Sequence, residues 1–133
     1  MARPRSEYPT GLELEILQIL WQQSPLSVQA VREALAKRPS SRELTHSSVI
    51  TVMNIMVGKR YLKRKKRGRA FEFAPRVSEQ DVNRGMLGDL VKRVFDGSAS
   101  ALMLELLETS DIDSEELKEL RKMINRKAKE QSP

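Results

Sequence analysis

Eight lysines and arginines crowd the segment Lys59–Arg69, which contains no acidic residue. A cluster of fixed positive charges can neutralise the phosphates of a nucleic acid without reading its sequence. Basic runs are most often solvated and disordered, but apolar side chains interrupt this one at Tyr61 and Leu62 and follow it at Phe71 and Phe73. This interleaving predicts a folded basic hairpin, and a folded basic surface favours a polyanionic partner.

Side chains that support catalysis or metal binding are scarce. The chain has no cysteine and one histidine, His46. Disulfides, thiolate ligands and cysteine nucleophiles are therefore excluded, and one chain cannot supply a multi-histidine metal site. No activated nucleophile can be identified beside His46, which is either a surface residue near a helix start or a phosphate contact. We expect a protein that is not an enzyme and that uses no metal or cofactor.

Charge divides the 133-residue chain into two halves. Residues 1–76 carry 15 lysines and arginines against 6 aspartates and glutamates, whereas residues 77–133 carry 9 against 12. This asymmetry predicts that the first half meets a polyanion and that the second does not. No stretch approaches the roughly 20 apolar residues of a membrane-spanning helix, and no apolar segment near the N-terminus resembles a secretory signal. We expect a cytoplasmic protein without membrane insertion.

Three helices are predicted ahead of the basic segment. The first runs over 12–22, and the second begins after Ser27, a residue suited to cap it. Thr45 can cap a third helix that runs to about Lys59. Four apolar side chains of this helix fall at i, i+3, i+4 and i+7 and should face a core: Val49, Val52, Met53 and Met56.

A second face of the third helix is mostly small and polar. Ser47, Ile50, Thr51 and Asn54 lie along it at helical spacing. Small hydroxyl and amide side chains let a helix approach a DNA groove closely, and they can bond base edges or phosphates. An ordinary solvated face is the alternative interpretation. Ile50 could contact a thymine methyl group.

Two short strands are predicted next, over 61–66 and 70–74, with a turn at Arg67-Gly68-Arg69. Three helices followed by a basic hairpin is the order of a winged helix-turn-helix. In that motif the third helix enters the major groove and the hairpin, or wing, lies along the DNA backbone. The predicted recognition-helix residues are Thr45, His46, Ser47, Ser48, Ile50, Thr51 and Asn54. The predicted wing residues are Lys63, Arg64, Lys65, Lys66, Arg67 and Arg69.

The second half is predicted to be helical, over 78–96, over 99–108 and from Asp113 onward. Asp113 can cap the last helix, with Glu116 at its third position. These segments carry more large apolar side chains than three short helices bury alone, which predicts pairing with a second copy; packing on the first half is the alternative. The predicted dimerisation residues are Leu87, Leu90, Val91, Val94, Leu102, Leu106, Leu117, Leu120 and Ile124.

The expected fold is mainly α with a small β-hairpin, in which a winged helix-turn-helix precedes a three-helix dimerisation region. We expect a flexible arm over 1–10, the winged-helix domain over 11–76, the dimerisation domain over 77–130 and a tail over 131–133.

Several segments in this order resemble the penicillinase repressor family. The stretch 12–17 with Leu20-Trp21 is similar to that family's first helix, and 44–49 with Tyr61-Leu62 is similar to its recognition helix and wing entry. Residues 71–75 resemble the return strand of the wing, and 113–124 resemble the last helix.

This resemblance implies a dimeric winged-helix repressor that occupies a palindromic operator. In relatives that respond to β-lactams, a membrane sensor triggers proteolysis in the C-terminal region. The matching bond is Glu105-Leu106, where this chain lacks the Asn-Phe pair of its relatives. The copper-responsive branch senses metal through C-terminal cysteine pairs, which are absent from this chain.

The combined expectation is a transcriptional repressor that binds a duplex DNA operator as a homodimer. Its release signal is unknown, and a membrane sensor or protease acting on the C-terminal region is a candidate partner. The rival interpretation is an RNA-binding or adaptor module that uses the basic hairpin without reading DNA sequence.

Overall fold

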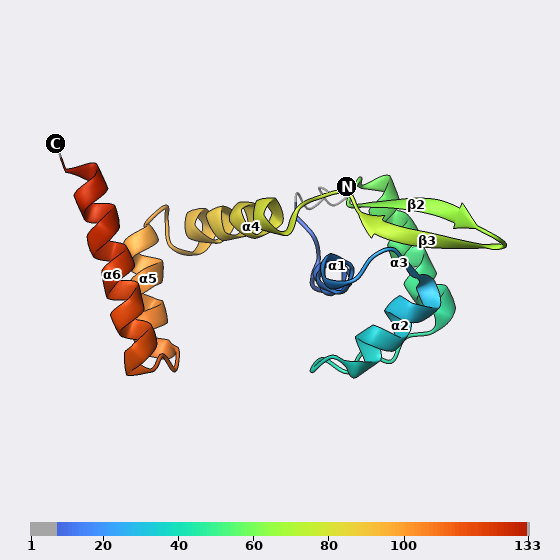
Figure 1. Cartoon of the computed structure of the whole chain (residues 1–133), viewed down its shortest axis with the longest axis horizontal. Coiled ribbons are helices and arrows are strands. Elements are labelled where there is room, and N and C mark those ends of the chain that lie inside the picture. The colour runs from blue at the N-terminus through green and yellow to red at the C-terminus, as the bar shows by residue number, and fades with distance from the viewer. Residues whose placement is uncertain (1–7, 133) are drawn as a thin grey trace. The chain divides into compact units, whose positions relative to one another are not determined.

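The computed structural model describes residues 8–132, which form helices and strands in two compact units, one that ends at Leu87 and one that begins at Gly88 (Figure 1). None of the described helices is both long enough and apolar enough to cross a lipid bilayer. The elements in chain order are α1 (Gly11–Gln22), β1 (Leu26–Ser27), α2 (Val28–Lys37), α3 (His46–Gly58), β2 (Leu62–Arg67), β3 (Ala70–Pro75), α4 (Glu79–Val94), α5 (Ala99–Thr109) and α6 (Ser114–Gln131).

Side-chain caps fix where the first three helices begin. The Thr10 hydroxyl accepts from the Glu13 N–H at 3.3 Å, and the Glu13 carboxylate accepts from the Thr10 N–H at 2.9 Å. This reciprocal capping box places Thr10 in the structure of α1, although it was expected in a flexible arm. Ser27 and Thr45 cap α2 and α3 as predicted. Residues 1–7 of the expected arm, and residue 133 of the expected tail, lie outside the described residues.

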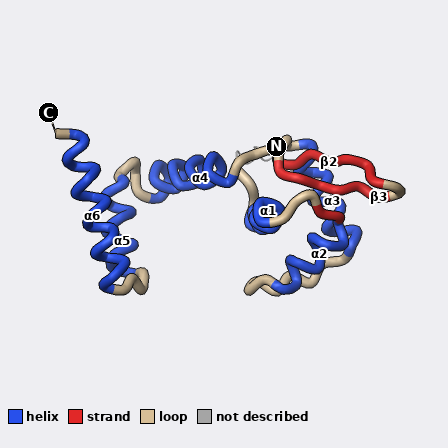
Figure 2. The backbone as a smooth tube through the Cα atoms, in the orientation of Figure 1, coloured by secondary structure: helices blue, strands red, loops and turns tan. Residues whose placement is uncertain are grey.

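The sheet contains the predicted hairpin and one additional strand. Leu62 lies opposite Pro75 and Arg67 opposite Ala70, so β2 and β3 pair along their whole lengths. Gly68 turns the chain with a φ of 64°, a conformation that glycine adopts without steric cost. The unpredicted strand β1 pairs with the other edge of β3, which gives the order β1-β3-β2. Figure 2 shows the hairpin of β2 and β3 in red.

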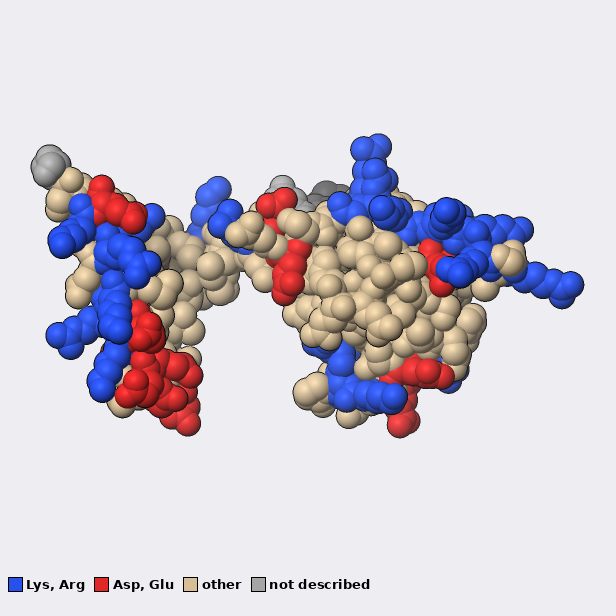
Figure 3. All heavy atoms as spheres, viewed as in Figure 1, with Lys and Arg blue, Asp and Glu red and all other residues tan. Residues whose placement is uncertain are grey.

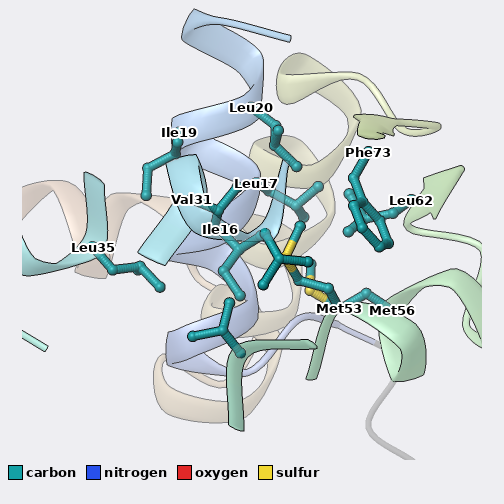
Figure 4. Packing of buried hydrophobic residues seen from close by; sticks show 12 residues of the cluster. Ile16, Leu17, Ile19, Leu20, Val31, Leu35, Met53, Met56, Leu62 and Phe73 are labelled. Atoms are coloured by element: carbon teal, nitrogen blue, oxygen red, sulfur yellow. The ribbon is translucent and has the colours of Figure 1, made fainter. Parts of the chain in front are cut away.

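One apolar core holds the three helices and the hairpin together (Figure 4). Its members are Ile16, Leu17, Ile19, Leu20, Val28, Val31, Leu35, Val49, Met53, Met56, Leu62 and Phe73. Of the α3 residues predicted to face it, Val49, Met53 and Met56 are fully buried, and Val52 packs against it at partial exposure. Because Leu62 and Phe73 are core residues, the base of the hairpin is fixed relative to α3.

The boundary between the units falls inside α4, after Leu87, and not between 76 and 77 as expected. The beginning of α4 belongs to the first unit because its Val82 is buried and its Gly85 lies against Tyr8. A Cβ added at Gly85 would come within 2.9 Å of the Tyr8 ring. The Trp21 indole N–H also donates to the carbonyl of Val77 at 2.9 Å, which ties α1 to the segment before α4.

The second unit comprises the end of α4, α5 and α6. Its helices have the predicted starts: Ser98 caps α5, and Asp113 caps α6 by accepting from the Glu116 N–H at 2.8 Å. No residue described between 88 and 132 is buried in the single chain. Capping therefore defines these helices locally, and their apolar side chains do not form a core within one chain.

Candidate nucleic-acid interface

The exposed face of α3 carries most of the predicted recognition residues. Ser47, Ser48, Thr51 and Asn54 are exposed, while the opposite face of the helix forms part of the core. The Thr51 hydroxyl donates to the Ser47 carbonyl at 2.8 Å, which leaves its lone pairs available to a donor outside the protein. Core packing thus holds the helix so that a row of short polar side chains faces outward.

The beginning of α3 is also accessible. Thr45 and His46 are exposed, and the Thr45 hydroxyl accepts from the Ser48 N–H at 3.1 Å. This cap satisfies one of the free N–H groups in the first turn, and the partial positive charge of a helix N-terminus favours anions. His46 lies at the surface beside the cap, a position that is compatible with both of its interpretations.

The apolar residue on the exposed face differs from the expected one. Ile50 is only partly exposed and packs against the core cluster, whereas 49% of Ile55 is accessible. Ile55 follows Thr51 by one helical turn and adjoins Asn54, so it shares their face. The helical period places Ile50 nearer than Ile55 to the buried stripe of Val49, Met53 and Met56, in agreement with the greater exposure of Ile55.

The six predicted wing residues are exposed, and those on β2 divide between the two faces of the hairpin. Side chains alternate along a strand, so Arg64 and Lys66 share the face of the buried Leu62. Lys63, Lys65 and Arg67 occupy the other face, and Arg69 lies in the turn. Arg67 pairs with Glu72 at 3.3 Å. Figure 3 shows lysine and arginine side chains gathered over β2 and β3.

Arg64 connects the wing directly to the recognition helix. Its Nη1 donates to Asn54 Oδ1 at 2.6 Å. Its guanidinium carbon also lies 4.7 Å from the centroid of the Phe71 ring, within the range of a cation–π contact. Two of the predicted site residues are thus joined, one from each predicted element.

A partly buried ion pair fixes the C-terminal end of α3. Lys59 Nζ lies 2.9 Å from a carboxylate oxygen of Glu13, and Glu13 is the only buried charged residue among those described. Lys59 is also 6.0 Å from the centroid of the Tyr61 ring. Burial, with a smaller contribution from the Glu13 charge, raises the pKa of the Tyr61 phenol. The pair joins the beginning of α1 to the end of α3, where the wing begins.

The long segment between α2 and α3 is held by a second carboxylate, Glu15. It accepts from the hydroxyl of Ser40 and forms ion pairs with Arg42 and Arg38. The Ser40 hydrogen bond and the two arginines lower the pKa of Glu15, against an opposing effect of burial. This clamp fixes the approach to the N-terminus of α3, and sequence spacing gave no signal for it.

Arg60 closes α3 in an unusual backbone conformation. The Tyr61 N–H donates to the Met56 carbonyl at 2.9 Å, and the Arg60 N–H donates to the Val57 carbonyl at 3.1 Å. These are the two bonds of a Schellman motif, in which the residue at the Arg60 position is usually glycine. Arg60 adopts it with a φ of 66° and an exposed side chain. The chain therefore holds a cation in a left-handed conformation between the helix and the wing.

The predicted dimerisation residues lie on α4, α5 and α6 at partial or full exposure. Leu87, Leu90, Val94, Leu106, Leu117, Leu120 and Ile124 are exposed, and Val91 and Leu102 are half-buried. The Glu105-Leu106 bond lies inside α5.

The fold and the interface together define the class of the protein. A core-packed helix with an exposed polar face, followed by a basic hairpin, is the arrangement of a winged-helix DNA-binding domain. The family model described as penicillinase repressor matches residues 9–126. The chain belongs to the penicillinase repressor family.

Individual relatives agree with this assignment. The methicillin resistance regulatory protein MecI of Mammaliicoccus sciuri is 24% identical over 118 residues, which cover 89% of this chain and 94% of that protein. The penicillinase repressor of Bacillus licheniformis is 26% identical over 112 residues, or 84% and 85% of the two chains. Both names are those of regulators, which supports a non-enzyme role. The solved complex of hsRosR-S4 has a similar fold, with a TM-score of 0.50, 15% identity and 95% coverage of both chains.

Proposed function

We propose that the chain represses transcription by binding an inverted-repeat operator as a homodimer, with α3 in the major groove and the wing along the backbone. The observation that carries this proposal is the exposed polar face of α3 held on the same rigid core as the basic hairpin. An α-helix fits the major groove, where each base pair presents a distinct pattern of donors, acceptors and methyl groups. Ser47, Thr51 and Asn54 supply polar contacts there, and Ile55 is suited to a thymine methyl.

The wing supplies affinity that does not depend on sequence. Each phosphate neutralised by a lysine or arginine releases counterions, so binding weakens as salt increases. Lys66 lies on the hairpin face shared with Leu62, the face that packs toward α3. Lys65 lies on the opposite face. The two neighbouring lysines therefore place equal charges on opposite faces of the hairpin, only one of which is the face of the core residue Leu62.

A second copy of the chain is the proposed partner of the C-terminal helices. No described residue from 88 to 132 is buried, although α5 and α6 expose Leu106, Leu117, Leu120 and Ile124. Contiguous apolar surface of this kind marks an interface. The charge distribution of α6 favours pairing with α6 of a second copy, because acidic residues occupy the beginning of the helix and basic residues its end. Two such helices oppose unlike charges when they lie antiparallel, the arrangement produced by a two-fold axis perpendicular to them.

Homodimerisation through the C-terminal unit would set two recognition helices at a fixed separation. A two-fold protein matches a two-fold site, so we expect an inverted repeat whose half-sites lie about one helical turn apart, or a multiple of it. A signal that separates the two copies would release the operator, whether it is a protease, a ligand or a partner such as a membrane sensor. Cleavage at Glu105-Leu106 would require local opening of α5, since the bond is helical.

Fluorescence anisotropy of the full chain on the DNA upstream of its own gene tests this function. A scrambled duplex and a duplex RNA of equal length serve as competitors over a range of salt concentrations. We expect a preference of at least about 10³-fold for the upstream duplex over the scrambled one. Equal and weak binding of all three polyanions would contradict the proposal and favour the RNA-binding or adaptor interpretation.

Two variants separate the proposed roles within that assay. Lys66→Gln should weaken binding to every duplex and reduce the slope of log K against log salt by about one unit, and Lys65→Gln should reduce it less. Asn54→Ala should weaken binding to the preferred duplex by about 1–3 kcal/mol and leave binding to scrambled DNA nearly unchanged. If Asn54→Ala and Lys66→Gln had the same effect on both duplexes, the division into base and phosphate contacts would be wrong.

A further inference from the structure

We propose that Arg64 is a specificity-determining positioning residue, which engages the amide oxygen of Asn54 so that Asn54 presents N–H donors to the DNA. The inference rests on the proposed function and names the chemistry that α3 reads: a base with hydrogen-bond acceptors in the major groove, which at this position is guanine. It also assigns to one wing residue a role different from phosphate neutralisation.

The hydrogen bond itself fixes the orientation of the Asn54 side chain. An arginine has N–H donors and no acceptor, so only the oxygen of an asparagine amide can face it. In the 2.6 Å contact from Arg64 Nη1 that atom is Oδ1. The Nδ2 group, with two N–H donors, then points elsewhere. Both residues are exposed, and the remaining N–H groups of Arg64 add further donors to the same patch.

The arginine is held in place from the other side by Phe71. Its guanidinium lies 4.7 Å from the ring centroid, and Arg64 is paired across the strands with the core residue Phe73. A planar guanidinium can stack and donate at the same time, which a lysine ammonium cannot reproduce. Arg64 thus contacts the helix from the base of the hairpin, where the chain is fixed two residues away by the buried Leu62.

The base preference follows from this donor pattern. Asparagine ordinarily recognises adenine through two bonds, in which its oxygen accepts from N6 and its nitrogen donates to N7. The Arg64 bond competes for the oxygen required by that arrangement. Guanine presents two acceptors, N7 and O6, on its major-groove edge and needs donors only. The paired Asn54 and Arg64 groups therefore favour guanine over adenine.

Selection from a randomised duplex pool measures this preference with the intact protein. The wild-type chain defines the preferred site, and Asn54→Ala identifies the position that Asn54 reads as the one where preference disappears. We expect guanine there in the wild-type selection. In Arg64→Lys the charge and the salt dependence are retained, while the guanine-over-adenine ratio at that position falls about tenfold or more.

Two further variants control for charge and folding. Arg76→Lys makes the same exchange at an exposed residue that follows β3, outside the predicted wing and recognition helix, and should leave every base preference unchanged. Asn54→Asp keeps a partner for Arg64 but has no N–H donor, so it should also lose the guanine preference. Unfolding monitored by Trp21 fluorescence verifies that each variant is folded.

The outcomes discriminate between the two levels of the proposal. Enrichment of one sequence by the wild type with an unchanged guanine ratio in Arg64→Lys would overturn this inference alone. Adenine at the Asn54 position, or a uniform loss of affinity in Asn54→Ala that indicates a phosphate contact, would overturn it as well. A wild-type selection without any enriched sequence would overturn the proposed function and this inference with it.

Discussion

Replacing Arg60 by glycine should stabilise the winged-helix unit and weaken its binding to DNA. Arg60 occupies the left-handed position of the Schellman motif that ends α3, with a φ of 66°. A side chain in this conformation brings its Cβ close to the following carbonyl oxygen, and glycine avoids that contact. The exposed guanidinium lies between the proposed recognition helix and the wing, where its charge would act on a nearby phosphate.

The magnitude follows from two opposing contributions. The left-handed conformation costs a residue with a Cβ about 1–2 kcal/mol. Glycine has more conformational freedom in the unfolded chain, which lowers the free energy of unfolding by about 0.4–1 kcal/mol and offsets part of this gain. Both hydrogen bonds of the motif are backbone bonds and remain in the variant. Arg60→Gly should therefore raise the free energy of unfolding by about 0.5–1 kcal/mol relative to Arg60→Ala.

The stability assay is urea denaturation followed by the fluorescence of Trp21, the one tryptophan of the chain. Its indole bonds to Val77 within the first unit, so its signal reports on the winged-helix unit. DNA binding is measured in parallel over a range of salt concentrations. Arg60→Ala removes the charge without relieving the backbone, and Arg60→Lys retains both the charge and the conformation.

The three variants should give three different results. Glycine stabilises and weakens binding, alanine weakens binding without stabilising, and lysine changes neither property substantially. One lost phosphate contact should reduce the salt slope by about 0.9. The conformational reasoning would be refuted if glycine were no more stable than alanine. Undiminished binding by both uncharged variants would remove Arg60 from the DNA interface.

Three further predictions concern the rest of the chain. Glu13→Gln should destabilise the first unit by about 2 kcal/mol in urea denaturation, because it leaves the amine of Lys59 without its charged partner; a change below about 0.5 kcal/mol would show that the pair contributes little. Leu120→Glu should convert the dimer to a monomer in sedimentation at micromolar concentration without shifting the Trp21 unfolding transition, and an unchanged mass would contradict the proposed interface. The lowered pKa of Glu15 means that the folded state favours the ionised carboxylate, so the stability that this carboxylate contributes is present at neutral pH and declines as the pH falls below 4.5. The difference in unfolding free energy between wild type and Glu15→Gln should therefore shrink as the pH is lowered below 4.5.

Local patterns in the sequence predicted most of the fold. Ser27, Thr45 and Asp113 are caps because their side chains bond to N–H groups three residues on, an interaction contained within one helical turn. The spacing of Val49, Met53 and Met56 identified the buried face of α3, since one face of a helix repeats every three or four residues. The hairpin followed from alternation in 70–74 and from the turn at Gly68.

Features that depend on distant segments were not predictable in this way. Strand β1 has two residues, too few for any periodicity, and it forms because β3 has a free edge. The bond between Arg64 and Asn54 joins residues ten positions apart, on a strand and a helix whose approach is set by the core. The unit boundary within α4 depends on the contact between Gly85 and Tyr8.

The absence of buried residues from the described part of the second unit links its folding to protein concentration. Helices that gain a core only from a second copy are stabilised by mass action, so their folded fraction follows the amount of protein in the cell. Dilution during growth would then loosen the C-terminal helices while the winged-helix unit, with its own core, stays folded. The proposed dimer thereby sets a threshold concentration. Below the dissociation constant of the dimer, operator occupancy would fall more steeply than the protein concentration itself.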